Sequence, residues 1–219
     1  MLGRDMTRAF LRARRPEHKQ QRREAILAAA RELAVASGVR NVSLGAVAEA
    51  VGLAKSNIVR YFGTREEIFL ILAAEEWRQW AAAVTARLEV SGDVPVILAE
   101  TLADRPLFCD LLGHTATTLE QNVSVEAARA FKRAILAVVA DLGEQVVRVT
   151  GLRDGEGVDL VGAAGALAGA LYPMSNPSPA LAELYAQEPD LAAACPDFLS
   201  TLVRALKAFL AGLPTLRED

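Results

Sequence analysis

The fold of this chain is decided by the stretch from Leu44 to Phe62, which reads LGAVAEAVGLAKSNIVRYF. Its apolar residues are spaced so that two short helices, crossing at about 90–120° around a glycine turn, would share a small core. Gly52 supplies the turn, because glycine takes positive φ angles that other residues avoid. Ala48 stands four residues earlier, where a larger side chain would push the second helix away. The stretch therefore predicts a helix-turn-helix, with a core of Val47, Val51, Leu53, Ile58 and Phe62.

Hydroxyl residues stand before two of the predicted helices. Ser43 can accept hydrogen bonds from the free N–H groups of the first helix, an end that would then face an anion such as a DNA phosphate. Thr64 precedes the next helix, and the run Thr64-Arg65-Glu66-Glu67 has the pattern of a capping box. We therefore expect the Thr64 hydroxyl to accept from the Glu67 N–H, and the Glu67 carboxylate to accept from the Thr64 N–H.

From about Arg22 to Leu72 the chain resembles the N-terminal DNA-binding domain of the TetR family of bacterial repressors. The resemblance lies in a long first helix, the segments GVRNVSL and AVAEAVGL, a recognition helix ending in Tyr61-Phe62, and the segment REEIF. One departure is Val59, where the family often carries an aromatic residue that contacts phosphate, so that contact is lost or passes to Arg60 or Tyr61. The resemblance implies an all-α protein: a three-helix, helix-turn-helix DNA-binding domain, then an all-helical dimerisation and ligand-binding domain.

Charge is divided unevenly along the chain. Residues 1–65 carry thirteen Lys or Arg and five Asp or Glu, a net charge of +8. The whole chain of 219 residues has 24 basic and 27 acidic side chains, so the remainder has 11 basic and 22 acidic ones, a net charge of -11. A basic region favours nucleic acid, whereas phosphates would repel the acidic remainder. We expect only the N-terminal head to touch DNA.

Three domains follow from this division. Residues 1–21 hold six Lys or Arg with little apolar periodicity, and we expect a flexible basic arm that adds phosphate or minor-groove contacts; the alternative is a solubilising tail. Residues 22–72 form the predicted DNA-binding domain, and residues 73–219 the helical body. Its two cysteines lack a pairing signature and no signal-peptide core follows the charged start, so we expect a cytoplasmic protein with reduced thiols.

Helical spacing, glycines and prolines predict the remaining elements. A first helix ends before Gly38, and a long one over Glu66–Leu88 links head to body. Tyr172–Asp190 is expected to be a loop with at most a short helix at Leu181–Tyr185. The run Val158–Tyr172 contains Asp159 and is shorter than the ~20 residues of a membrane span, so we expect a buried helix and no membrane association. Further helices are predicted over Pro95–Ala103, Pro106–Leu119, Val125–Val149, Val158–Leu171 and Pro196–Leu210.

The predicted DNA-binding residues lie on or beside the second helix of the motif. There, side chains near the helix N-terminus reach base edges and flanking ones reach phosphates. The alternative is an ordinary solvated helix face, but the apolar residues already determine which face is buried and leave these on the other. The expected contacts are Ser43, Lys55, Ser56, Asn57, Arg60, Tyr61 and Thr64.

The resemblance to the TetR family implies a ligand site in the body, because members of that family usually enclose an apolar cavity there, lined with a few polar groups. The alternative is that these aromatics are simply core. Cys109 and His114, with Asp110 beside them, could suggest a metal or catalytic pair, but they share no helical face and lack a third group. A buried thiol and a polar histidine are the default readings. The candidate ligand residues are Trp77, Trp80, Phe108, Cys109, His114, Asn122 and Phe131.

We expect a ligand-responsive transcriptional regulator that binds a palindromic double-stranded DNA operator as a homodimer and is released by a small, largely apolar effector. The helices over Val158–Leu171 and Pro196–Leu210 are expected to form the dimer interface, with Ala166 and Gly169 in it. No cofactor, metal or catalytic residue is expected. Two alternatives stay open: a body that only dimerises, and an α-helical enzyme, for which the sequence offers no nucleotide-binding loop or nucleophile motif.

Overall fold

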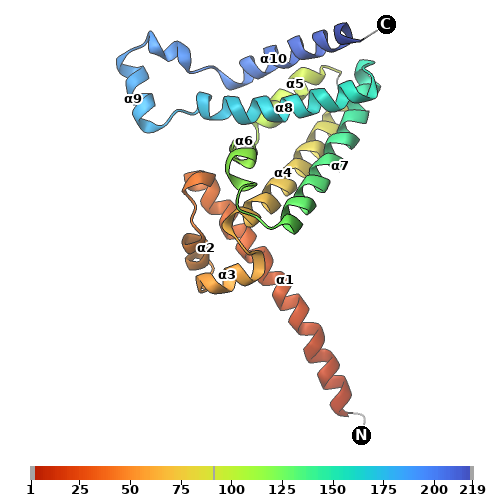
Figure 1. Ribbon diagram of the computed structural model, residues 1–219, viewed down its shortest axis with the longest axis vertical. Helices are drawn as coiled ribbons and strands as arrows, with labels where there is room; N and C mark the ends of the chain where they lie inside the picture. Colours follow the sequence, from red (N-terminus) through yellow and green to blue (C-terminus); the bar gives the residue numbers. More distant parts are fainter. Residues whose placement is uncertain (1–2, 91, 218–219) are drawn as a thin grey trace.

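The structure is a computed structural model that describes residues 3–90 and 92–217, with side chains from residue 18 onward. Every regular element in these residues is helical, so the predicted all-α class is confirmed. A lower head of α1 to α3 joins an upper body, and α9 extends away from the body (Figure 1). The elements are α1 (Gly3–Ser37), η1 (Val39–Asn41), α2 (Leu44–Ala50), α3 (Lys55–Phe62), α4 (Arg65–Leu88), α5 (Val94–Ala103), α6 (Pro106–His114), η2 (Thr115–Leu119), α7 (Val125–Thr150), α8 (Asp154–Ser175), α9 (Pro179–Gln187), η3 (Leu191–Ala194), α10 (Phe198–Gly212) and η4 (Leu213–Leu216).

The helix-turn-helix forms as its spacing predicts. Gly52 has φ of +64° between α2 and α3, the region that favours glycine. Ser43 caps α2, because its Oγ accepts from the Ala46 N–H at 3.1 Å. Ile58 and Phe62 of α3 are buried against α1 and α2, in one apolar cluster with Ile26. The buried face of α3 therefore leaves the opposite face to solvent.

The capping box at the start of α4 forms only in half. Thr64 Oγ1 accepts from the Glu67 N–H at 3.2 Å, as expected. The expected reverse bond is absent among the described residues, since the Thr64 N–H donates instead to the Phe62 carbonyl at 2.9 Å. Gly63, with φ of +74°, turns the chain so that this local bond closes. The Glu67 carboxylate is left free to accept from the Ser124 N–H at 2.9 Å, and so ties α4 to the start of α7.

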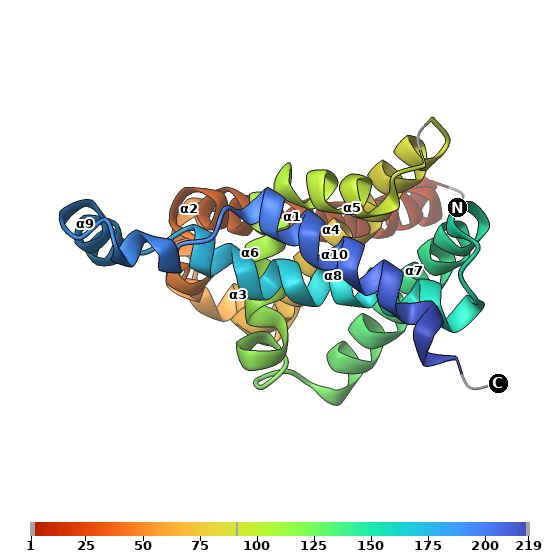
Figure 2. The same cartoon turned by 90° about the horizontal axis from the view of Figure 1, so that it is seen from above.

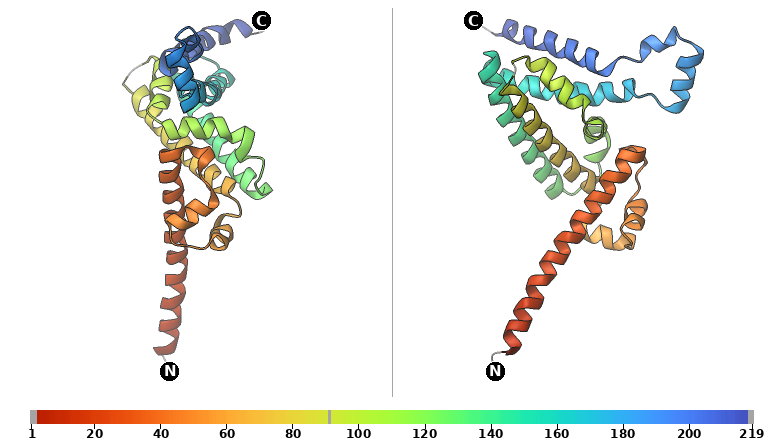
Figure 3. Two further views of the ribbon diagram at one scale, coloured as in Figure 1. Left: turned by 90° about the vertical axis from the view of Figure 1, so that its left-hand side faces the viewer. Right: turned by 180° about the vertical axis from the view of Figure 1, so that it is seen from behind.

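The segment expected to be a flexible arm is helical in the structure from residue 3, continuous with α1 (Figure 3). Arginine, alanine, glutamine and other good helix formers make up most of this segment, and extending an existing helix avoids the cost of nucleation. Residues 1 and 2 of the expected arm lie outside the described residues. Contacts of this segment with DNA stay a prediction.

Two long helices, α4 and α7, run side by side from the head into the body (Figure 1). Across their far ends lie α8 and α10, which pack on each other with α5 beside them (Figure 2). Glycines allow the closest approaches. A Cβ atom at Gly157 of α8 would lie 2.4 Å from the Gly143 carbonyl oxygen of α7, and one at Gly169 would lie 2.9 Å from the Gly113 nitrogen of α6. Gly169 therefore faces α6, which corrects its expected place in a dimer interface.

Several helix limits differ from the expectations. The segment Pro106–Leu119 is divided, because α6 ends at His114 and a π-helical turn follows, in which the Thr115 and Thr117 hydroxyls donate to carbonyls four residues back. Helix α8 begins at Asp154, where acidic residues of the first turn favour a helix N-terminus. It continues past Pro173, because a proline near the helix end removes few hydrogen bonds.

Helix α8 spans 22 residues, longer than the apolar run in the sequence suggested. By length and composition it could cross a membrane, as could the segment Phe198–Leu216. Yet α8 packs against α6, α7 and α10 and contributes buried residues to the body core. Its burial supports a core helix.

The buried side chains that the structure describes form two apolar clusters. One lies in the body and contains the side chains of α5 together with Trp77 and Trp80. The other fills the head, but it also includes Leu111 of α6, Leu119 of η2 and Phe131 of α7. The apolar core of the head therefore continues into the body. A shift of α6 or α7 would move side chains that pack against the core of the helix-turn-helix.

Candidate nucleic-acid interface and the junction behind it

The outward face of α3 carries the residues predicted to contact DNA. Lys55, Ser56 and Arg60 are exposed, whereas Asn57 and Tyr61 are half-buried. Val59, which replaces the aromatic residue common in the family, is 44% exposed on the same face. Five of the seven predicted contacts thus lie on α3, and three of these five are exposed.

The two predicted hydroxyl contacts both serve as helix caps. Ser43 is exposed at the start of α2 and Thr64 is half-buried at the start of α4. Each hydroxyl oxygen accepts a backbone N–H, so its own proton is free to donate to a phosphate oxygen. Capping and phosphate binding are compatible at both positions.

Basic residues of α1 lie beside the end of α3. The Arg23 guanidinium lies 4.5 Å from the centre of the Phe62 ring and donates to the Tyr61 carbonyl at 3.5 Å. Lys19, one turn earlier, and the adjacent Arg22 line a surface hollow together with Tyr61. Helix α3 is therefore flanked by the cations Lys19, Arg22 and Arg23, of which only Lys19 belongs to the predicted basic arm.

Helix α6 of the body holds the loop before α2. The Asp110 Oδ2 accepts from the Val39 N–H at 2.7 Å, and its Oδ1 lies 3.4 Å from the His114 Nε2. Burial would raise the Asp110 pKa, but the hydrogen bonds from His114 and Val39 outweigh it and lower the pKa below its ordinary value. Arg65 donates to the Val39 and Val42 carbonyls from the other side. The loop is therefore fixed by one residue of the body and one of α4.

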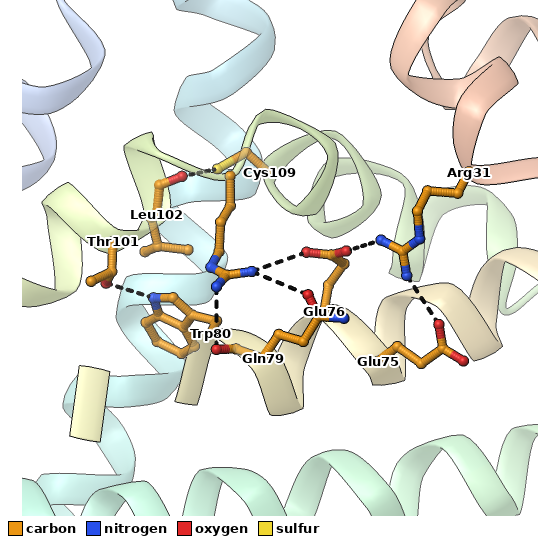
Figure 4. Close-up of polar contacts among 9 residues, drawn as sticks. Arg31, Glu75, Glu76, Gln79, Trp80, Thr101, Leu102 and Cys109 are labelled. Atoms are coloured by element: carbon orange, nitrogen blue, oxygen red, sulfur yellow. Dashed lines mark hydrogen bonds and ion pairs between the residues drawn. The ribbon is translucent and has the colours of Figure 1, made fainter. Parts of the chain in front are cut away.

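A buried carboxylate joins α1 to the body (Figure 4). The Glu76 side chain is 6% exposed, and it accepts from the Arg31 guanidinium of α1 and lies 3.6 Å from Arg105, which precedes α6. Arg31 also pairs with Glu75 at 3.0 Å, and Arg105 donates to the Gln79 carbonyl at 3.3 Å. One carboxylate on α4 thus connects the head helix with the loop between α5 and α6.

Four of the predicted ligand residues lie within the body core. The rings of Trp77, Trp80 and Phe108 pack edge-on or tilted, with centres 5.2–5.9 Å apart. The Trp80 Nε1 donates to Thr101 at 2.9 Å, and the Cys109 Sγ donates to the Leu102 carbonyl at 3.3 Å (Figure 4). Burial raises the Cys109 pKa to about 12, with Asp110 adding to the effect. The thiol is protonated and directed at a carbonyl.

The other three predicted ligand residues lie elsewhere. Asn122 is exposed in the loop before α7, and His114 lines a hollow between η1 and η2. Phe131 lines a cavity of about 370 Å³ at the junction of head and body, between α4, α7 and the end of α3. Ligand binding by all seven residues stays a prediction.

Two polar residues of the junction cavity, Arg23 and Arg78, were not predicted from the sequence. The signal for Arg78 was available: it lies four and seven residues after Ala74 and Ile71, so it interrupts an apolar face of the Glu66–Leu88 helix. Among the described residues no three His, Cys, Asp or Glu side chains gather as metal ligands, and Cys109 and His114 each face a different partner.

Comparison with protein-family models matches both parts of the chain. Residues 26–72 match the bacterial regulatory proteins of the tetR family, and residues 74–217 match a tetracyclin repressor-like C-terminal domain. A search of curated protein sequences finds no match.

Solved structures share the fold at low sequence identity. FadR of Thermus thermophilus, a TetR family transcriptional repressor in complex with lauroyl-CoA, is 18% identical over 90% of this chain and 97% of that one, with a TM-score of 0.56. The fatty acid degradation regulator FadR of Bacillus halodurans is 14% identical over 87% and 98%, with a TM-score of 0.54. RolR with resorcinol is 12% identical over 93% and 98%, with a TM-score of 0.52. Since the two family models together cover most of the sequence, the chain belongs to the TetR family and is a transcriptional regulator of that family.

Proposed function

We propose that this regulator is a repressor that binds a palindromic operator as a homodimer through the outward face of α3. The observation that carries the proposal is the polar and basic surface of that helix, with Lys55, Ser56 and Arg60 exposed within residues 1–65, which have a net charge of +8. Lys and Arg contacts displace counterions condensed on DNA, so binding should weaken steeply with salt. The acidic body limits the contact to the head.

The homodimer is supported by an unpartnered surface on α8. Val158 and Met174 are 38% and 52% exposed. Every fourth residue between them along the helix is exposed as well, namely Gly162, Ala166 and Ala170. Leu199 and Phe209 of the adjacent α10 are each 37% exposed. Small and apolar residues on two neighbouring helices suit a four-helix interface, and two heads reach successive major grooves about 34–36 Å apart.

Control by a small, largely apolar effector is supported by two observations. The Thermus thermophilus FadR structure holds lauroyl-CoA, which has an apolar acyl chain, and the RolR structure holds resorcinol, a small aromatic molecule. In this chain, the Glu76 and Asp110 carboxylates join the body to the head, so a ligand that moves α4 or α6 would also move the helix-turn-helix. A body that only dimerises is the alternative, and a thermal-shift screen with small apolar compounds separates the two.

The operator is found by capturing genomic DNA fragments with the purified protein and sequencing them. Fluorescence anisotropy on the recovered site then compares wild type with Arg60→Ala and Tyr61→Phe. Both variants should bind more weakly while melting at the wild-type temperature. Arg148→Ala, a charge removal on the distant end of α7, is the matched control and should bind as wild type does. Equal binding by all four proteins would refute α3 as the reader.

The dimer is tested separately with Ala166→Arg, which puts a charge on the exposed stripe of α8. Sedimentation should show a folded monomer that no longer holds the palindromic site. A wild-type monomer at micromolar concentration would contradict the proposal. We also propose that the protein is cytoplasmic, as expected of a DNA-binding regulator.

A further inference from the structure

The cavity at the junction of head and body is walled by four helices. Leu70 and Ile71 of α4 and Ala127 and Phe131 of α7 contribute apolar walls, and Tyr61 and Phe62 close the end toward the head. Its volume of about 370 Å³ lies in the range of small-molecule sites, about 300–1,000 Å³. A ligand here would touch the end of the reader helix and the body at once.

Charge in this cavity is not balanced by ion pairs. Arg23 and Arg78 both line it, and within the described part of the chain neither forms an ion pair with a carboxylate. Of the two acidic lining residues, Glu67 is engaged by the Ser124 N–H, and Glu126 is exposed in the first turn of α7. The lining therefore carries two arginines and two glutamates, and the groups in it that can donate charge-assisted hydrogen bonds to an acidic ligand are the guanidinium groups of Arg23 and of the exposed Arg78.

We propose that the junction cavity is the effector site and that it takes a compact aromatic carboxylate. The aromatic body would lie among the Phe62, Phe131 and Tyr61 rings, and the carboxylate would accept hydrogen bonds from the Arg78 or Arg23 guanidinium. The inference rests on the proposed function, because it gives the effector of that function a place and a chemical class. Binding would act directly on the last turn of α3, since Tyr61 and Phe62 belong to that turn.

The test uses the full chain and two probes of similar shape, 2-naphthoate and the uncharged 2-naphthalenemethanol, with affinities measured by calorimetry. Wild type should bind 2-naphthoate roughly tenfold more tightly than the alcohol, because about one charge-assisted hydrogen bond contributes a difference of that size. Arg78→Gln should lose most of that preference while keeping the affinity for the alcohol. Arg133→Gln, an exposed arginine of α7 outside the lining, is the charge-matched control and should keep it.

A second pair of variants tests whether the ligand binds in the junction cavity, without changing the charge of the protein. Ala130→Phe fills the cavity from α7 and should weaken both probes at least tenfold. Ala137→Phe adds the same ring to the same helix at an exposed position outside the lining, and should change neither affinity. Circular dichroism melting checks that each variant folds. If Ala130→Phe does not fold, the Arg78→Gln comparison decides alone.

The outcomes separate the inference from the proposed function. No binding of 2-naphthoate, or binding that neither Arg78→Gln nor Ala130→Phe weakens, would overturn the junction site and leave operator binding as proposed. Binding that both variants weaken, together with a lower operator affinity in the presence of 2-naphthoate, supports the site and its control of DNA. Binding that both weaken with operator affinity unchanged supports the site and overturns its role as the effector site.

Discussion

Replacing Glu76 by glutamine tests whether the head is held to the body by a buried charge. The Glu76 side chain is 6% exposed and faces Arg31 of α1 and Arg105 before α6. Glutamine keeps the shape but removes the negative charge between the two guanidinium groups. Glu75 is the matched control, because it is the adjacent residue, pairs with the same Arg31 at 3.0 Å, and is 33% exposed.

The two carboxylates should differ in their contribution to the free energy of unfolding. Removing one partner of a fully buried ion pair costs about 3–5 kcal/mol. Here the cost is lower, because Arg31 and Arg105 are 30% and 24% exposed and can recover water. We expect roughly 2–3 kcal/mol for Glu76→Gln, which lowers the melting temperature by about 4–12 °C in a protein of this size. For Glu75→Gln we expect about 0.2–1 kcal/mol, as for other exposed pairs.

Urea unfolding of wild type and both variants, followed by circular dichroism, measures these differences. A double-mutant cycle with Arg31→Met separates the pair interaction from other effects of the substitution. Free energies of unfolding for Glu76→Gln and Glu75→Gln that differ by less than about 0.5 kcal/mol, the usual error of additivity, would contradict this reasoning. The Glu76 contacts would then not hold the head to the body.

Three further outcomes follow from the geometry. Gly157→Ala should destabilise the protein by roughly 1–3 kcal/mol in urea unfolding, because its Cβ would lie 2.4 Å from an α7 carbonyl, whereas Gly155→Ala, with no neighbour within 4 Å, should be tolerated. The lowered pKa of Asp110 means that its contribution to stability is present above the ordinary value of 3.8 and is lost as pH falls through the lowered value; Asp110→Asn should remove this part of the acid dependence of the melting temperature. In native protein at pH 8, a thiol reagent should modify the half-buried Cys195 and spare Cys109, whose pKa is about 12, and equal rates would contradict its burial.

The helix-turn-helix could be predicted almost completely, because its signals are local. Gly52, Ser43 and the apolar positions of the helix-turn-helix act within a few residues of one another, and the structure has them as expected. The capping box failed in its second half for a non-local reason. Glu67 accepts from the Ser124 N–H, 57 residues away in sequence, and no local pattern shows such a competitor.

The body was predictable as a set of helices but not as an arrangement. Gly169 was a small residue on an apolar helix, and only packing shows that it faces α6 and leaves Ala166 exposed. The aromatic residues that were expected to line one effector cavity likewise lie in two different places. Trp77, Trp80 and Phe108 pack on one another, while Phe131 lines the junction cavity with Arg23 of the head. Spacing along a helix gives a face, but which helix covers that face depends on the whole fold.

The most direct test of the account is the operator affinity of wild type, Arg60→Ala and Tyr61→Phe, measured by fluorescence anisotropy over a salt titration. We expect a linear fall of log affinity with log salt for wild type and weaker binding by both variants at each salt concentration, with unchanged melting temperatures. If Arg60 contacts a phosphate, its removal should also reduce the slope by about 0.9. Both variants binding as wild type does across the titration would contradict the claim that α3 reads the operator.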